Sequence, residues 1–150
     1  MAQTEQELRV QLAACYRIFD HIGWSEMIFN HITAKVPGPE NHFLINPYGL
    51  HYSEAKASNL VKVDIDGNIV EKTDYKVNPA GIIIHTAIHQ ARPDVHCIAH
   101  THTNAGMAVA CSQEGLRPDN FYSALLHLSL IHISEPTRPL YISYAVFCLK

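Results

Sequence analysis

The chain has 150 residues, 47% of them hydrophobic and 17% charged, with a formal net charge of −3. This length and composition fit one globular domain with a sizeable core. The small acidic charge and the lack of any basic run exclude the electrostatic signature of nucleic-acid binding, and no apolar run approaches the roughly 20 residues that a membrane-spanning helix needs, so no membrane insertion is expected.

The cysteines predict a reducing environment. Cys15, Cys97, Cys111 and Cys148 are scattered and form no C-x-x-C pair. The N-terminus is polar and acidic, which is unlike the basic start and apolar run of a secretory signal. A cytoplasmic location is therefore expected.

A capping box opens the first predicted element. The Thr4 side chain can accept from the backbone N–H of Glu7, whose carboxylate can accept in return. Apolar residues then recur at helical spacing: Leu8, Leu12, Cys15, Phe19 and Ile22. Because Gly23 is a typical helix stop, the pattern predicts an amphipathic helix over Glu5 to Ile22 that packs on a sheet.

A β-hairpin is predicted next. Residues 30–36 alternate in polarity, Pro37-Gly38-Pro39 breaks the strand, and residues 42–45 form the returning strand. Asn30 stands where this strand begins. It is explained equally well as a turn residue, since asparagine tolerates the left-handed region, and as a ligand contact.

The segment after this hairpin predicts a short helix and a second hairpin. Ser53 is a favourable N-cap for a helix over residues 53–58. Residues 60–64 and 68–70 favour β-structure and flank Asp66-Gly67, which is one of the strongest local hairpin signals.

A second helix is predicted over residues 82–90. Apolar residues recur at helical spacing, and Arg92-Pro93-Asp94 ends the pattern. His85 and His89 stand four residues apart on one helix face, a spacing that also occurs in metal sites. A structural role against the sheet is the favoured interpretation, because no acidic or thiol partner lies beside them in the sequence.

The apolar, β-branched run from Val95 to His102 predicts a strand that carries the H-x-H pair of His100 and His102. The two-residue period of a strand places both imidazoles on one face, where they could bind one divalent metal ion. A site needs at least a third ligand. A helix over residues 104–112, capped by Thr103, completes a layered α/β pattern.

Residues 128–150 differ in character from the rest of the chain. The blocks 128–138 and 142–150 resemble a translated transposase-type sequencing adapter and flow-cell primer site, and the three residues between them match an index read in frame. We interpret 128–150 as a non-native tail and 1–127 as the N-terminal part of a longer domain.

An ordered series of motifs spans residues 8 to 127. They are Gly23-Trp24-Ser25, Phe29-Asn30-His31-Ile32-Thr33, the run from His42 to Leu50, Tyr52-Ser53-Glu54, Leu60-Val61-Lys62-Val63, Asn78-Pro79-Ala80-Gly81, and Ala91 to Asp94 leading into His100-Thr101-His102. In these motifs the chain resembles the class II aldolase and adducin head-domain family, most closely its adducin-like branch. The resemblance implies an α/β fold, a three-layer α/β/α sandwich with a central, mainly antiparallel sheet, here truncated at the C-terminus, and assembly as a homotetramer.

The resemblance also implies a metal site. His100 and His102 match the first two ligands of a divalent ion, usually zinc, in the catalytic members, with a third histidine expected beyond residue 127. Such an ion stabilises the enediolate formed when a carbon–carbon bond breaks, while a carboxylate moves protons. Gly81 stands at the position that matches this carboxylate, so no catalytic residue is assigned.

Five further positions match substrate contacts of the family. Asn30 and Gly49 are the same residues as in the family, Tyr48 replaces a smaller hydroxyl residue, and Pro79 and Ala80 lack the hydroxyls that hold substrate phosphate in aldolases.

Two hypotheses about the function follow from the resemblance. One is a zinc-dependent aldehyde-lyase or epimerase acting on small hydroxy-carbonyl, sugar-type substrates, which explains the histidine pair. The other is a non-catalytic adducin-like domain for oligomerisation or cytoskeleton-type binding, which explains the missing carboxylate.

Overall fold

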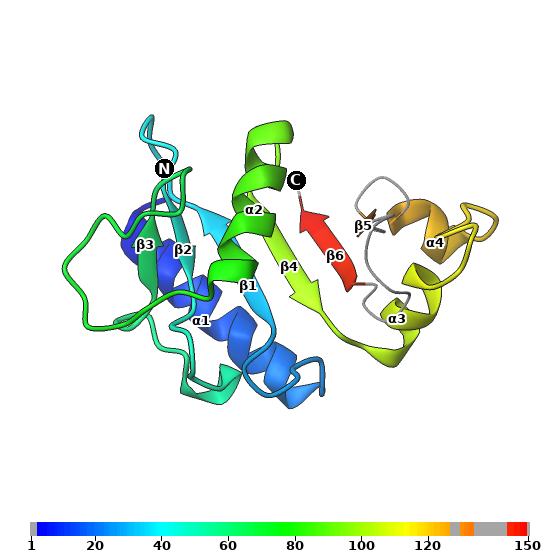
Figure 1. Ribbon diagram of the computed structural model, residues 1–150, viewed down its shortest axis with the longest axis horizontal. Helices are drawn as coiled ribbons and strands as arrows, with labels where there is room; N and C mark the ends of the chain where they lie inside the picture. Colours follow the sequence, from blue (N-terminus) through cyan, green and yellow to red (C-terminus); the bar gives the residue numbers. More distant parts are fainter. Residues whose placement is uncertain (1–2, 127–129, 134–143, 150) are drawn as a thin grey trace.

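The structure is a computed structural model that describes residues 3–126, 130–133 and 144–149 (Figure 1). Within these residues, the strands form one antiparallel sheet in the order β3-β2-β1-β4-β6-β5. The strands are β1 (His31–Lys35), β2 (Phe43–Ile45), β3 (Val61–Val63), β4 (Cys97–Thr101), β5 (Leu130–Ile133) and β6 (Tyr144–Leu149). The helices are α1 (Glu5–His21), α2 (Pro79–Ala91), α3 (Asn104–Ala110) and α4 (Phe121–Leu126), with a 3-10 turn, η1 (Tyr52–Glu54).

Helices α1 and α2 pack on opposite faces of the sheet, because side chains alternate along β1. Ile32 packs with Leu12 of α1 in one apolar cluster. Its neighbour Thr33 points the other way and contacts His85 of α2. This arrangement is the three-layer α/β/α sandwich with a mainly antiparallel sheet that the family resemblance implies.

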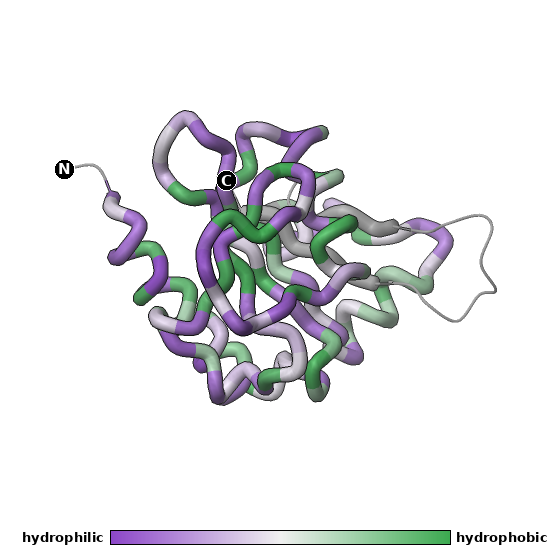
Figure 2. Tube along the Cα trace, turned by 60° about the vertical axis from the view of Figure 1, so that its left-hand side comes forward, coloured by the Kyte–Doolittle hydropathy of each residue, from purple (hydrophilic) through white to green (hydrophobic). Residues whose placement is uncertain are grey.

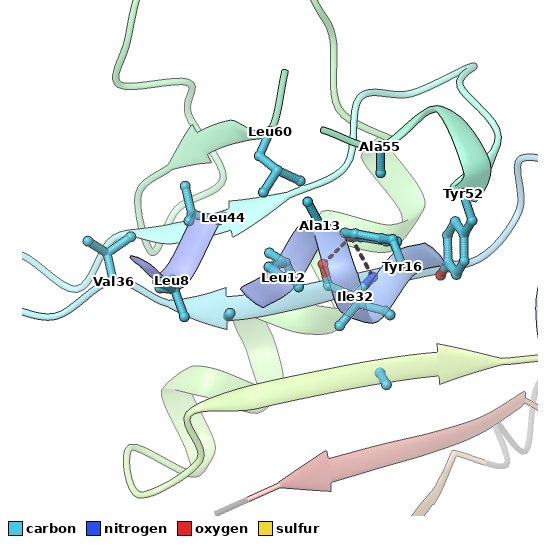
Figure 3. Packing of buried hydrophobic residues seen from close by; sticks show 12 residues of the cluster. Leu8, Leu12, Ala13, Tyr16, Ile32, Val36, Leu44, Tyr52, Ala55 and Leu60 are labelled. Carbon is cyan, nitrogen blue, oxygen red and sulfur yellow. Dashed lines mark hydrogen bonds between the residues drawn. The ribbon is translucent and has the colours of Figure 1, made fainter. Parts of the chain in front are cut away.

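The core on the α1 face is organised around the hydroxyl of Tyr16, which is fully buried (Figure 3). This oxygen accepts from the backbone N–H groups of Ile32, at 2.9 Å, and Asn46, at 3.0 Å. Its own proton can go to the Ile32 carbonyl or to Asn46 Oδ1. The ring also packs edge-on against Tyr52, with centroids 4.6 Å apart. One side chain therefore ties α1 to β1 and to the end of β2.

Local sequence signals set the ends of the two long helices. Thr4 Oγ1 accepts from Glu7 N at 3.2 Å and Thr4 N donates to Glu7 at 2.8 Å, so the capping box is confirmed. Hydrophilic and hydrophobic residues alternate along α1 in Figure 2. Helix α2 begins three residues before the predicted range, because Asn78 caps it and Pro79 fits the first turn, where no N–H is needed.

Two predicted elements differ from the structure. The helix expected over residues 53–58 is only the 3-10 turn η1, and its cap is His51 rather than Ser53. The second hairpin keeps its turn, but residues 68–70 make a single bridge to β3. The reason is that Glu71 Oε1 accepts from Lys62 N at 2.9 Å, so a side chain takes the N–H that a longer ladder would use.

Strands β5 and β6 lie within residues 128–150. Strand β6 pairs antiparallel with β4, in a register that places Val146 opposite His100. The adapter-like origin of this segment concerns how the sequence arose and stays a prediction. Across the residues that the structure describes, every helix is too short or too polar to cross a membrane.

Candidate metal centre

The end of β4 carries the histidine pair. His100 is buried and His102, one residue past the strand, is half-buried. Both imidazoles lie on one face, as predicted, and their Nε2 atoms are 3.0 Å apart. Two nitrogens that share one zinc ion at about 2.0–2.1 Å lie about 3.0–3.4 Å from each other, so the pair fits joint ligation.

A carboxylate orients His102, the outer histidine of the pair. His102 Nδ1 contacts the carboxylate of Glu26, which lies in the connection between α1 and β1. Because a carboxylate only accepts, this contact keeps the proton on Nδ1 and leaves the Nε2 lone pair for a ligand. Metal-ligating histidines typically have such a carboxylate partner on the second nitrogen.

A continuous series of hydrogen bonds leads from His100, the inner histidine of the pair, into the core. His100 Nδ1 is 3.0 Å from Nε2 of His31, its antiparallel partner on β1. His31 Nδ1 is 2.8 Å from His85 Nε2, His85 Nδ1 is 2.7 Å from Thr33 Oγ1, and the same oxygen is 3.0 Å from His89 Nε2. We call these five residues, His100, His31, His85, Thr33 and His89, the histidine chain.

Gly81 makes room for the histidine chain. A Cβ atom at this position would lie closer than 3.0 Å to Cδ2, Nε2 and Cγ of the His31 ring. Real Cβ atoms do not approach other atoms so closely, so any side chain at position 81 would displace the ring. The imidazole of His31 thus fills the space in which the family resemblance expects a carboxylate side chain to begin.

Burial keeps the histidine chain neutral. Desolvation lowers the pKa of His31 to about 4 and that of His100 to about 2, with like charge on neighbouring histidines adding to the effect. The pKa of fully buried His85 is also well below the ordinary value. Burial lowers the pKa of His89 to about 4, against the raising influence of the Val95 carbonyl. Neutral imidazole is the form that binds metal.

The depressed pKa of His89 predicts acid destabilisation. The unfolded chain takes up this proton near the ordinary pKa of about 6.5, whereas the folded chain does so only near pH 4, so the stability is fully present above about pH 6.5 and falls as the pH drops to 4. We expect a loss of about 3 kcal/mol from this residue by pH 4. Urea unfolding at several pH values measures it.

The variant His89→Gln separates this effect from general acid sensitivity. Glutamine removes the titrating group while it can still hydrogen-bond to Thr33, so the fall between pH 6.5 and 4 becomes about 3 kcal/mol smaller. Exposed His96 is the matched control, and its alanine variant keeps the full pH dependence. An unchanged slope in His89→Gln would contradict the assignment.

The described residues do not form a complete metal site. Within residues 3–126, 130–133 and 144–149, no group of three or more His, Cys, Asp or Glu side chains is arranged to hold an ion. His100 and His102 are therefore a pair of candidate ligands there.

The predicted substrate positions lie in three places. Asn30 is 2% exposed, adjoins the histidine chain through its neighbour His31, and its Nδ2 has no hydrogen-bond partner among the described residues. Pro79 and Ala80 are exposed in the first turn of α2, directly before Gly81. Tyr48 and Gly49 lie on a loop that contacts the segment before α2, where Tyr48 N donates to the Lys76 carbonyl at 2.8 Å.

Glu26, His31 and Thr33 belong to the site but were not predicted from the sequence. The alternation of β1 does place His31 and Thr33 on one face, which is the one signal that could have found them. It could not reveal that β4 and α2 both meet this face. His85 and His89 do face the sheet, as the structural interpretation predicts, although their side-chain partners are a threonine and another histidine.

A cavity of about 620 Å³ lies away from these histidines, on the α1 face. Its lining is mostly apolar and includes Leu8, Leu12 and Cys15 of α1 together with Ala34 and Val36. None of the residues of the candidate metal centre lines this cavity, so the cavity does not mark the position of that centre.

The chain belongs to the class II aldolase and adducin N-terminal domain family, whose model matches residues 10–140. Alpha-adducin of Rattus norvegicus is 53% identical over 116 residues, which cover 76% of this chain and 16% of that protein. The solved structure of an aldolase II superfamily protein from Pseudomonas syringae is 47% identical, with a TM-score of 0.77 and coverage of 86% of this chain and 52% of that one.

A second solved structure, L-fuculose 1-phosphate aldolase from Glaciozyma antarctica PI12, is 32% identical with a TM-score of 0.74, over 83% of this chain and 51% of that one. The chain spans about half the length of the bacterial curated relatives it matches, 49% of one and 45% of another.

Proposed function

We propose that this chain binds a divalent metal ion, zinc in the first instance, through Nε2 of His100 and His102, as part of a metal-dependent aldehyde-lyase or epimerase for small hydroxy-carbonyl substrates. The observation that carries the proposal is the 3.0 Å convergence of the two Nε2 atoms, with the second nitrogen of each ring already engaged by Glu26 or His31. Family membership and the similarity to a fuculose-phosphate aldolase support it.

Each residue has a defined role in this proposal. His100 and His102 hold the ion, which when bound supplies a Lewis acid that polarises a substrate carbonyl. Glu26 orients His102. The Asn30 amide, whose Nδ2 has no described partner, offers a hydrogen bond to a substrate oxygen, and Tyr48, Gly49, Pro79 and Ala80 border the substrate.

The start of α2 argues against a phosphorylated substrate. A helix N-terminus binds phosphate through free backbone N–H groups. Here Asn78 Oδ1 already accepts from Ala80 N at 3.1 Å and Gly81 N at 3.5 Å, and Pro79 has no N–H. An unphosphorylated hydroxy-carbonyl compound therefore fits this end of the site better than a sugar phosphate.

The second candidate function is a non-catalytic adducin-like domain that acts in self-assembly. Two observations favour it: the 53% identity to alpha-adducin, and the His31 ring that occupies the space beside Gly81 where a carboxylate would begin. In this alternative the histidine chain is a structural feature of the core, and the protein needs no metal.

Metal binding by the purified chain tests the proposal. We expect equilibrium dialysis against submillimolar zinc to approach about one ion per chain, because two histidines without the third expected ligand hold the ion weakly, and we expect the variants His100→Ala and His102→Ala each to weaken binding at least tenfold. His96→Ala is the matched control, since His96 is exposed just before the same strand.

Two outcomes would favour the assembly alternative instead. Equal zinc binding by the wild type and the double variant His100→Ala/His102→Ala would show that other residues hold the ion. No stoichiometric zinc, together with sedimentation as a defined oligomer, would remove the metal from the function altogether.

A further inference from the structure

Where every contact carries one proton and the Thr33 hydroxyl donates to one of its two histidine partners, the histidine chain has two self-consistent arrangements of its protons. Each neutral imidazole donates through one nitrogen and accepts through the other, and the threonine hydroxyl does the same. Since His100, His31, His85, Thr33 and His89 are joined end to end at 2.7–3.0 Å, the proton position on one residue fixes the positions on all the others.

Without metal, Glu26 sets the direction. When the His102 ring carries one proton, the carboxylate keeps that proton on Nδ1, so His102 Nε2 is an acceptor and His100 Nε2 must donate to it. His100 Nδ1 then accepts from His31 Nε2. The same logic continues inward to His89, which donates through Nε2 and leaves its Nδ1 unprotonated. In the structure His89 Nδ1 is a buried atom with no hydrogen-bond partner among the described residues, and the Val95 carbonyl, which raises the pKa of His89, is the acceptor available to this atom once it is protonated.

An ion held by both Nε2 atoms requires the opposite direction. His100 must then carry its proton on Nδ1 and donate to His31, which donates through Nδ1 to His85. His85 donates to Thr33, and Thr33 donates to His89 Nε2, so His89 is protonated on Nδ1. The count balances, because one proton leaves His100 Nε2 for solvent and one is taken up at His89 Nδ1.

We propose that His31, His85, Thr33 and His89 are positioning residues for the ligand His100, and that metal binding reverses every hydrogen bond of the histidine chain. This inference rests on the proposed metal site. It assigns a role to Gly81 as well, because only a residue without a side chain lets His31 stand between His100 and His85. The histidine chain thereby couples metal binding at the end of β4 to His89 of α2.

Imidazole nitrogen NMR of the ¹⁵N-labelled 150-residue chain tests the inference, because the spectrum distinguishes Nδ1–H from Nε2–H tautomers. The measurement is made at pH 8.5, well above the ordinary histidine pKa of about 6.5. Without metal we expect Nε2–H on His31, His85, His89 and His100, and Nδ1–H on His102. Saturating zinc should convert His31, His85 and His89 to Nδ1–H, while exposed His96 keeps its tautomer.

The variant Thr33→Val separates a connected chain from independent histidines. Valine keeps the shape of threonine and removes the hydroxyl that joins His85 to His89. We expect zinc still to convert His31 and His85 in this variant but to leave His89 unchanged. A His89 that still switches would overturn the proposal.

The failure of the inference differs from the failure of the proposed function. If zinc leaves His100 and His102 unchanged, the metal site is wrong. If zinc binds there but His89 keeps its Nε2–H tautomer, the metal site stands and the inference is wrong. A metal-free spectrum with Nδ1–H on His31 or His85 would overturn the inference whether or not zinc binds.

Discussion

Replacing Gly81 with alanine is expected to destabilise the protein by about 2–3 kcal/mol, the cost of forcing an atom into a filled core. Helix propensity alone predicts the opposite, since alanine in place of glycine inside a helix gains about 0.5–1 kcal/mol. The steric effect dominates because the new Cβ would meet three atoms of the His31 ring closer than 3.0 Å. The sign of the change in the urea midpoint decides between the two effects.

A double-mutant cycle identifies the cause of this loss. His31→Ala removes the ring, so adding Gly81→Ala to that background should cost at least 2 kcal/mol less than it does in the wild type, and the helix propensity gain should reappear. If Gly81→Ala is stabilising in the wild type, or equally destabilising in both backgrounds, the contact with His31 is not what constrains position 81.

Tyr16→Phe is expected to cost about 3 kcal/mol. The phenyl ring preserves the packing, but the lost hydroxyl leaves the backbone N–H groups of Ile32 and Asn46 buried without their partner. Each unsatisfied buried donor costs about 1–3 kcal/mol. Equilibrium unfolding in urea measures the difference, and the slope of the transition should stay unchanged because the same surface is buried.

Tyr52→Phe is the matched control. Tyr52 is as buried as Tyr16 and packs edge-on against it, yet its hydroxyl has no hydrogen-bond partner among the described residues. Removing an unpaired buried hydroxyl should be neutral or stabilising. Similar losses in both variants would mean that ring packing, and not the hydrogen bonds of Tyr16, holds α1 on the sheet.

Local signals predicted most elements of this fold. The capping box fixed the start of α1, the alternation of residues 30–36 located β1, and Arg92-Pro93-Asp94 marked the end of α2. These features depend on residues within one turn or one strand, so the sequence carries them directly. The element at residues 53–58 shrank to η1 because a histidine cap and tertiary contacts override the propensity of so short a segment.

Only one part of the candidate site, the pair of histidines at the end of β4, could be predicted from the sequence. His100 and His102 are two residues apart, so strand geometry alone places them together. His31 and His85 reach the same place through the pairing of β1 with β4 and the packing of α2 on the sheet, which are contacts between distant parts of the chain. No periodicity encodes such contacts, and only the three-dimensional structure shows that the histidines form one series.

The contact between Gly81 and His31 also constrains how the two positions can evolve. A side chain gained at position 81 without a change at position 31 produces a clash, whereas loss of the imidazole alone leaves a void beside His100 and His85. Either single step passes through a poorly packed intermediate. Family members that carry a carboxylate at the position of Gly81 should therefore carry a residue other than histidine at the position of His31, and the two should covary as a pair.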